Sequence, residues 1–282
     1  MDLRFRSATT LILSLVLVAC SDRRLPGESA RGIGPLAGRM LSDRAADWLT
    51  IDVPGVYIHV RRGSAAEADG QAISGSVSAV RQELFALLRG PESSDAAIQA
   101  HFFFVDSRDD TQRLTGRPLV GFIQQGEPTG VFAYTRGYHL APLLRHELTH
   151  LYTFEFWGVP RAGQWLVEGV GVWAAGKCQE HSPDELAAGA LARGALVPLR
   201  QLATAFRDLG EDVAMPQAGS IVGFLIRQGG LAAVQDLWKR ERPSTDHPLG
   251  PDGETLEKAW LDSLSGARPA TLDVPRLLRE GC

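Results

Sequence analysis

The stretch LLRHELTHLYTFEFWG, residues 143–158, places two histidines and a glutamate inside an otherwise apolar segment. Its leucines recur at helical spacing from Leu140 onward, and Gly158 is a residue type that often ends a helix. His146 and His150 are four residues apart, so on a helix they lie on one face about one turn apart. The stretch therefore predicts a buried helix with one polar face.

This polar face is suited to a zinc ion. Two imidazoles at this spacing can each point a ring nitrogen at one ion, as His146 and His150 would. Glu147 lies about 100° around the helix axis, so it flanks the ion and reaches a bound water rather than the metal. The alternative is a core helix whose histidines hydrogen-bond to backbone carbonyls. Because two histidines cannot complete a metal site, the zinc hypothesis requires a third ligand.

Glu168 is the best candidate for this third ligand. It lies in GQWLVEGVGVWAAG, residues 163–176, which predicts a second helix that ends at Gly176. Tryptophan, leucine and valine surround this carboxylate, and a nearby cation would stabilise its charge in such apolar surroundings. The other glutamate nearby, Glu155, falls toward the back of the first helix. The alternative is that Glu168 lies on an exposed edge of its helix.

The rest of the chain predicts an α+β fold. Strands are expected in WLTIDVPGVYIHVRRG (48–63), AAIQAHFFFVDS (96–107) and LVGFIQQGEPTGVFAYTR (119–136). Helices are expected at 76–89 and near 184–194, 198–208, 217–228, 231–241 and 254–265, and a short helix or turn near 108–116. This order predicts a small N-terminal mixed sheet with helices, followed by the helix of the candidate site and a mostly helical C-terminal part.

The N-terminal segment predicts export and a lipid anchor. Residues 1–19 have a short basic start and the apolar run TTLILSLVLVA, which is too short to span a bilayer and is typical of a signal peptide. LVAC, residues 17–20, resembles the lipobox of bacterial lipoproteins. That resemblance implies cleavage before Cys20, lipidation of this cysteine, and a membrane-anchored protein of the cell envelope. Ser21 after it favours the outer membrane, facing the periplasm. The alternative is an ordinary secretory signal or an uncleaved anchor.

Composition sets the domain organisation. Residues 20–45 are rich in Gly, Ser, Arg and Pro and are expected to be a flexible linker, so that 46–282 forms one domain. The net charge is −4 and the 29 basic residues are scattered, so no nucleic-acid partner is expected. Cys178 and Cys282 remain after the lipobox, and in an oxidising compartment they suggest a disulfide; two separate thiols are the alternative.

Two motifs together resemble a known family. HELTH at 146–150 followed by WLVEG at 165–169 resembles the gluzincins, the thermolysin-like zinc metallopeptidases, and in particular bacterial proteins of the MA-like peptidase group. AGSIVGFLIRQGG at 218–230 and TLEKAWLDSL at 255–264 are loosely similar to later segments of that group. The resemblance covers about residues 50–265.

The resemblance implies a zinc-dependent peptidase that acts on peptides or proteins. It implies Zn²⁺ held by His146, His150 and Glu168, with water as the fourth ligand. Glu147 would be the general base that later returns the proton to the leaving amine. The strand within residues 130–136 would be an edge strand that pairs with an extended substrate.

The chain departs from the family pattern at two positions. All four tyrosines precede Glu168, so the donor to the oxyanion would have to be His181 or His247; His247 lies in the Pro-rich segment RPSTDHPLG. Val172 stands where many gluzincins have an aspartate that orients a histidine, so another acceptor would be needed. These departures leave two alternatives: a catalytically inactive metal-binding or scaffolding lipoprotein, and structural histidines that bind no metal.

Overall fold

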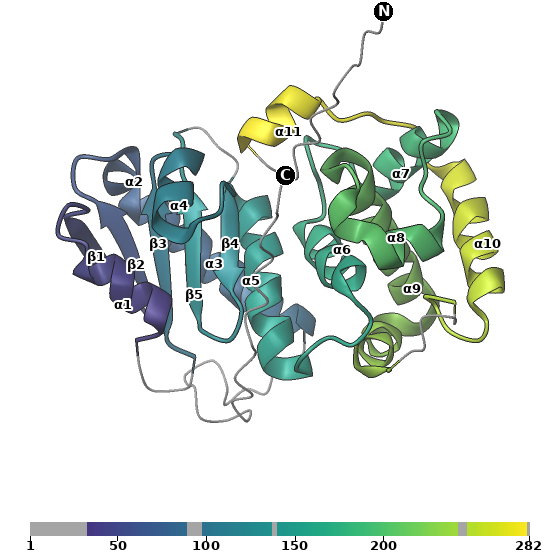
Figure 1. The fold of residues 1–282 in the computed structure, drawn as a ribbon, viewed down its shortest axis with the longest axis horizontal. Coiled ribbons are helices and arrows are strands. Elements are labelled where there is room, and N and C mark those ends of the chain that lie inside the picture. The colour runs from purple at the N-terminus through teal and green to yellow at the C-terminus, as the bar shows by residue number, and fades with distance from the viewer. Residues whose placement is uncertain (1–32, 89–97, 137–139, 242–246, 281–282) are drawn as a thin grey trace, which may run out of the picture.

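A five-stranded sheet dominates the N-terminal half of the molecule, and helices follow it (Figure 1). The structure is a computed structural model that describes residues 33–88, 98–136, 140–241 and 247–280. The predicted α+β class is confirmed. The predicted signal peptide and Cys20 lie outside the described residues, and among the described helices none is both long and apolar enough to cross a membrane.

The sheet is mixed. Its strands are β1 (Trp48–Val53), β2 (Val56–Arg61), β3 (Ala100–Val105), β4 (Gly121–Gln124) and β5 (Thr129–Ala133). Their order is β1-β2-β3-β5-β4, with β2, β3 and β5 parallel and both outer strands antiparallel to their neighbours. The prediction of an edge strand within residues 130–136 is therefore wrong. β4 folds back on β5 as a hairpin and takes the edge position itself.

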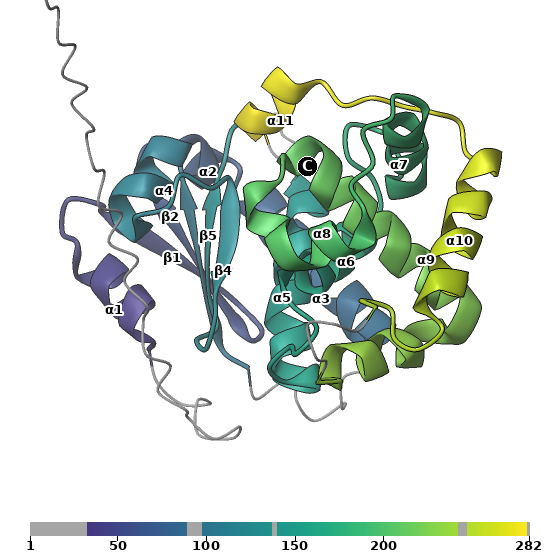
Figure 2. The same cartoon turned by 45° about the vertical axis from the view of Figure 1, so that its right-hand side comes forward.

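Helices cover both faces of the sheet (Figure 2). Side chains alternate between faces along a strand, so Phe103 of β3 points to one side and Phe102 and Phe104 to the other. Phe103 belongs to a buried cluster to which α1 (Pro35–Ser42) and α4 (Arg108–Thr115) also contribute. The opposite face packs on α3 (Gly70–Leu88) and α5 (Leu140–Trp157), and α2 (Ala65–Ala68) leads into α3.

Helix α1 corrects the predicted domain boundary. It lies within residues 20–45, which were expected to be linker, but Leu36, Ala37 and Met40 are buried against the sheet. These three residues lie on one face of the helix. The apolar period is short and lies among glycines, so the composition of the segment did not indicate a helix. The folded domain therefore includes α1.

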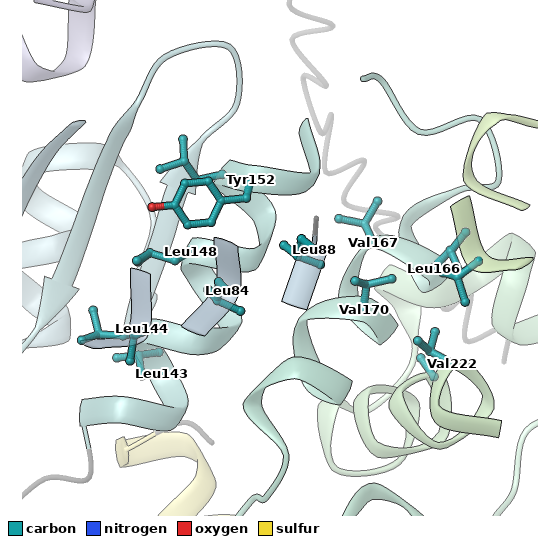
Figure 3. Packing of buried hydrophobic residues seen from close by; sticks show 14 of the residues in the cluster. Leu84, Leu88, Leu143, Leu144, Leu148, Tyr152, Leu166, Val167, Val170 and Val222 are labelled. Atoms are coloured by element: carbon teal, nitrogen blue, oxygen red, sulfur yellow. The ribbon is translucent and has the colours of Figure 1, made fainter. Parts of the chain in front are cut away.

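Helix α5 is buried between α3 and the next helix, α6 (Gln164–Ala175) (Figures 1 and 3). Leu144 and Leu148 are fully buried in the same apolar cluster as Leu84 and Leu88 of α3 (Figure 3). On the far side, α6 packs on α9 (Glu211–Lys239). A β-carbon on Gly169 would lie 2.8 Å from the carbonyl oxygen of Ala218, so only glycine permits this approach.

The remaining helices complete the C-terminal part. They are α7 (Pro183–Ala192), α8 (Leu199–Ala205) with the 3₁₀ turn η2 (Phe206–Asp208), α10 (Gly253–Ser263) with η3 (Leu264–Gly266), and α11 (Val274–Glu280). The two helices predicted near 217–228 and 231–241 are parts of α9, which departs from helical geometry at Gly230, where φ is 69°. Cys178 is disulfide-bonded, whereas Cys282, its predicted partner, lies outside the described residues.

Candidate metal site

Helix α5 presents a different group of side chains to each neighbour. Its leucines face α3 and the sheet, whereas His146 and His150 come together with Glu168 of α6. Two threonines inside the helix satisfy their hydroxyls on the carbonyl oxygens four residues earlier, Thr149 on Arg145 and Thr153 on Thr149. Both threonine hydroxyls are therefore satisfied inside the helix and need no partner from α6 or β4.

The connection from α5 to α6 fixes how the two helices meet. Gly158 adopts a left-handed conformation with φ of 79° at the end of α5, as its position in the sequence predicted. Trp238 of α9 donates its indole N–H to the Gly158 carbonyl at 2.9 Å, and its own carbonyl accepts the N–H of Arg161 at 2.8 Å. The indole N–H of Trp165 donates to the carbonyl of Ala162 at 2.9 Å. These bonds tie the α5–α6 connection to α9 and fix the start of α6.

The three predicted metal ligands converge on one point. Nε2 of His146 lies 3.1 Å from Nε2 of His150 and 3.2 Å from Oε2 of Glu168, and the third distance, from His150 Nε2 to this oxygen, is 3.4 Å. Donor atoms about 2.0 to 2.1 Å from a tetrahedral zinc ion lie about 3.3 to 3.4 Å apart. The triangle therefore has the size of one face of a zinc coordination sphere, and the donor set is one that zinc prefers.

The charges at this point also suit a cation. The side chain of Glu168 is only 16% exposed, and this burial acts to raise the pKa of its carboxyl. The charge of His150 and hydrogen bonds to His146 and His150 outweigh burial and hold the pKa well below its usual value. Glu168 is therefore a carboxylate, and a cation at the centre of the triangle would be neutralised in part by it.

Glu147 occupies a separate, drier position beside the triangle. Burial raises the pKa of its carboxyl to about 7, partly offset by the charge of His146 and by a hydrogen bond from the backbone N–H of Ile123 in β4. A cation held by the neighbouring ligands would lower this pKa again, because an opposite charge favours the carboxylate. Glu147 is thus placed between the histidines and the edge strand of the sheet, where it can exchange a proton.

Gly171 of α6 lies directly against both histidine rings. A β-carbon at this position would lie 3.0 Å from Cε1 of His146 and 3.0 Å from Cε1 of His150. The rings themselves are nearly perpendicular, with centroids 4.7 Å apart. Any larger residue at 171 would push the rings away from α6, so glycine sets their distance from Glu168.

Three contacts of the site were not predicted from sequence. Gln164 donates its side-chain N–H to Oε1 of Glu168 at 2.5 Å, and the i, i+4 spacing on the predicted helix could have revealed this contact. Gly171 follows Glu168 at i+3, which places it on the same face and is a weaker signal. The contact of Ile123 with Glu147 joins distant segments, and no local pattern indicates it.

The predicted oxyanion donors are not brought into the triangle. His247 lies beside α10, where its Nε2 is 2.9 Å from Glu257 and its Nδ1 accepts the N–H of Leu249 at 3.2 Å. Glu254 and Glu257 lie near enough to His247 to form a second possible ligand group. Because Nδ1 of His247 accepts a hydrogen bond, however, its Nε2 carries the proton and has no lone pair for a metal. His181 forms a backbone bridge with Cys178 and does not belong to the metal-ligand group.

The predicted acceptor behind the histidines is missing for one ring. Nδ1 of His150 is buried, and no residue in the described part of the chain accepts a hydrogen bond from it. Val172, which stands at the position of the family's aspartate, is itself buried in the apolar packing of α6. The His150 ring is therefore held by contact with Gly171 and by its Nε2 contacts to His146 and Glu168, without a hydrogen bond at Nδ1.

Known proteins do not identify this site. No protein-family model matches the chain, and no curated protein matches it. The resemblance to gluzincins thus stays a prediction from two short motifs, and support for a metal ion comes from the triangle of His146, His150 and Glu168.

Proposed function

We propose that the protein is a zinc metallopeptidase of gluzincin type that hydrolyses peptide bonds in the cell envelope, anchored through a lipidated Cys20. The observation that carries the proposal is the triangle of His146, His150 and Glu168, whose three ligand atoms lie within 3.4 Å of one another. When bound there, zinc would act as a Lewis acid and lower the pKa of a water molecule. The protein would supply the proton transfers and the orientation of the substrate.

Glu147 would carry the proton. Its carboxylate would take a proton from the water as that water attacks the peptide carbonyl, and would give the proton to the amine that leaves. Burial and the N–H of Ile123 hold the side chain in place between α5 and β4. A buried base with a fixed carboxylate meets the geometric requirement for this role better than a solvated one.

The edge strand β4 would bind the substrate backbone. Among the described strands, only β5 pairs with β4, and Glu147 lies along the other side of β4. An extended peptide could add to this open edge through main-chain hydrogen bonds, which would bring its carbonyls close to Glu147. The proposal therefore moves the predicted substrate strand from residues 130–136 to residues 121–124.

The proposal is tested by separating metal binding from cleavage. We expect the full-length protein to bind about one zinc ion per chain, measured by competition with a chelator. Glu147→Gln should keep this zinc but lose cleavage of a peptide library by at least about 100-fold, because the proton carrier is removed. Glu155→Gln, an exposed position on the same helix, is the matched control and should keep both. Failure of the unchanged protein to bind zinc would contradict the proposal.

A catalytically inactive metal-binding or scaffolding lipoprotein is the second candidate. It is favoured by one observation: within the described segments, neither His181 nor His247 joins the ligand triangle as a donor to the oxyanion. If zinc binds but neither the unchanged protein nor the Glu155→Gln control cleaves any peptide of a broad library, this second function replaces the first.

A further inference from the structure

The two carboxylate oxygens of Glu168 have different surroundings. Oε2 faces the Nε2 atoms of His146 and His150 at 3.2 and 3.4 Å. Oε1 accepts a hydrogen bond of 2.5 Å from the amide of Gln164, one turn earlier on α6. The partners of both oxygens lie on the helices α5 and α6, so the orientation of the carboxylate plane is fixed without any metal.

A third residue fixes which end of the Gln164 amide points at Glu168. Arg207 of η2 donates from Nη2 to Oε1 of Gln164 at 3.4 Å. A guanidinium has only donors and a carboxylate has only acceptors. The amide must therefore turn its oxygen toward Arg207 and its N–H toward Glu168, so the orientation follows from the network rather than from a choice between amide rotamers.

From this relay we infer that Gln164 is a positioning residue that makes Glu168 a ligand through one oxygen only, with Arg207 orienting the amide. The inference rests on the proposed metal site. A carboxylate can bind a cation through one oxygen or through both. If Oε1 were free, it could turn toward the ion and occupy the position that catalytic zinc sites keep open for water or substrate. The bond from Gln164 would prevent this rotation.

Cobalt(II) in place of zinc gives a test that does not require catalysis. Four-coordinate Co²⁺ absorbs visible light much more strongly than five- or six-coordinate Co²⁺, so absorption reports whether Glu168 binds through one oxygen or two. In the full-length protein loaded with Co²⁺, we expect Gln164→Ala to weaken the absorption and to weaken zinc binding about 10- to 100-fold. Gln164→Glu, which keeps the length of the side chain but replaces the donor by an acceptor, should do the same.

Matched variants separate this role from general destabilisation. Gln71→Ala, at an exposed position in the first turn of α3, should leave the cobalt spectrum and zinc affinity unchanged. Arg207→Lys, which keeps a donor, should retain the original spectrum, whereas Arg207→Met should shift it in the direction of Gln164→Ala. An unchanged spectrum and unchanged zinc affinity in both Gln164 variants would overturn the inference alone. Absence of metal binding in the unchanged protein would overturn the proposed function together with it.

Discussion

At the scale of single residues, Gly171 limits how closely α6 approaches the histidines of α5. The space around its Cα is filled by the two rings, each 3.0 Å from an added β-carbon. Metal ligands tolerate displacements of only about 0.5 Å before a site loosens. An uncharged residue that touches no substrate thus controls the shape of the ligand triangle.

We expect Gly171→Ala to weaken zinc binding about tenfold, because the added methyl group displaces both rings. Chelator competition measures the affinity. The matched control is Gly75→Ala in α3, where nothing lies within 4 Å of an added β-carbon. Both changes favour helix formation, so a loss confined to Gly171→Ala cannot come from helix propensity. Equal zinc affinity in the two variants would contradict the prediction.

The buried pair of His59 and His101 predicts how stability depends on pH. His59 accepts or donates at both ring nitrogens, to Thr50 at 3.0 Å and to His101 at 2.9 Å. Burial, followed by the charge of His101, lowers the pKa of His59 to about 4. A histidine in the unfolded chain has a pKa of about 6.5. Between about pH 4 and pH 6.5 the unfolded state therefore binds more protons than the folded state.

Neutral His59 therefore contributes fully to the free energy of unfolding above about pH 6.5. This contribution, about 3 kcal/mol, is lost as the pH falls toward about 4. Urea unfolding of the metal-free protein at a series of pH values measures it. We expect His59→Gln to be less stable at neutral pH but to show a shallower decline in acid. A decline as steep as that of the unchanged protein would show that other groups cause the acid sensitivity.

The three ligands of the candidate site could be predicted from the sequence, whereas the residues around them could not. The ligand triangle followed from spacing on two helices, because a helix places i and i+4 residues on one face and apolar surroundings make a lone carboxylate conspicuous. The surroundings of these ligands were not accessible in the same way. Ile123 reaches Glu147, and Arg207 reaches Gln164, only after the chain has folded, so sequence distance conceals both contacts.

At the scale of elements, apolar periods and glycines located most helices, including the short α4 and α8, and two other short helices were missed. α5 and α6 begin and end close to the expected positions, since leucine periods and glycines mark them. α1 and α11 are eight and seven residues long and were missed, because such short helices depend on tertiary partners. The position of β4 at the edge depends on strand order, which alternation of side chains does not determine.

Helix α1 is capped at its N-terminus by a side chain from a distant turn. Its N-cap residue, Gly34, has no side chain to cap the helix, and the carboxylate of Glu127 in the β4–β5 turn accepts the N–H of Leu36 at 3.1 Å and of Ala37 at 3.4 Å. A carboxylate at this end of a helix satisfies free N–H groups and interacts favourably with the helix dipole.

We expect Glu127→Ala to lower the free energy of unfolding by about 1 kcal/mol and to speed hydrogen exchange at the first turn of α1. Amide exchange followed by mass spectrometry measures the local effect, and urea unfolding measures the global one. Gln125→Ala, an exposed position in the same turn, is the control. Exchange in α1 that is no faster than in this control would show that apolar burial alone holds the helix.

At the scale of the whole molecule, the segment before α11 crosses α7 and forms hydrogen bonds with it and with the residues after α6. The N–H of Ala270 donates to the carbonyl of Glu185 at 2.9 Å, and the side chain of Gln179 exchanges two hydrogen bonds with the backbone of Asp273, at 2.7 and 2.9 Å. Cys178, beside Gln179, is disulfide-bonded. The hydrogen bonds of Asp273 thereby tie this segment to the segment that directly follows α6.

Gly189 allows this crossing, because a β-carbon on it would overlap the carbonyl oxygen of Ala270, only 1.8 Å away. We expect Gly189→Ala to displace the segment around Ala270 from α7 and to lower the free energy of unfolding by about 1 to 3 kcal/mol, although alanine favours the helix itself. Limited proteolysis should then cut the chain between about residues 267 and 273 faster than in the Gly75→Ala control, while zinc affinity stays unchanged because α5 and α6 carry the ligands. If cleavage there is no faster, contact with α7 is not what holds the crossing segment in place. If zinc affinity falls as well, the segment around Ala270 supports the metal site from a distance.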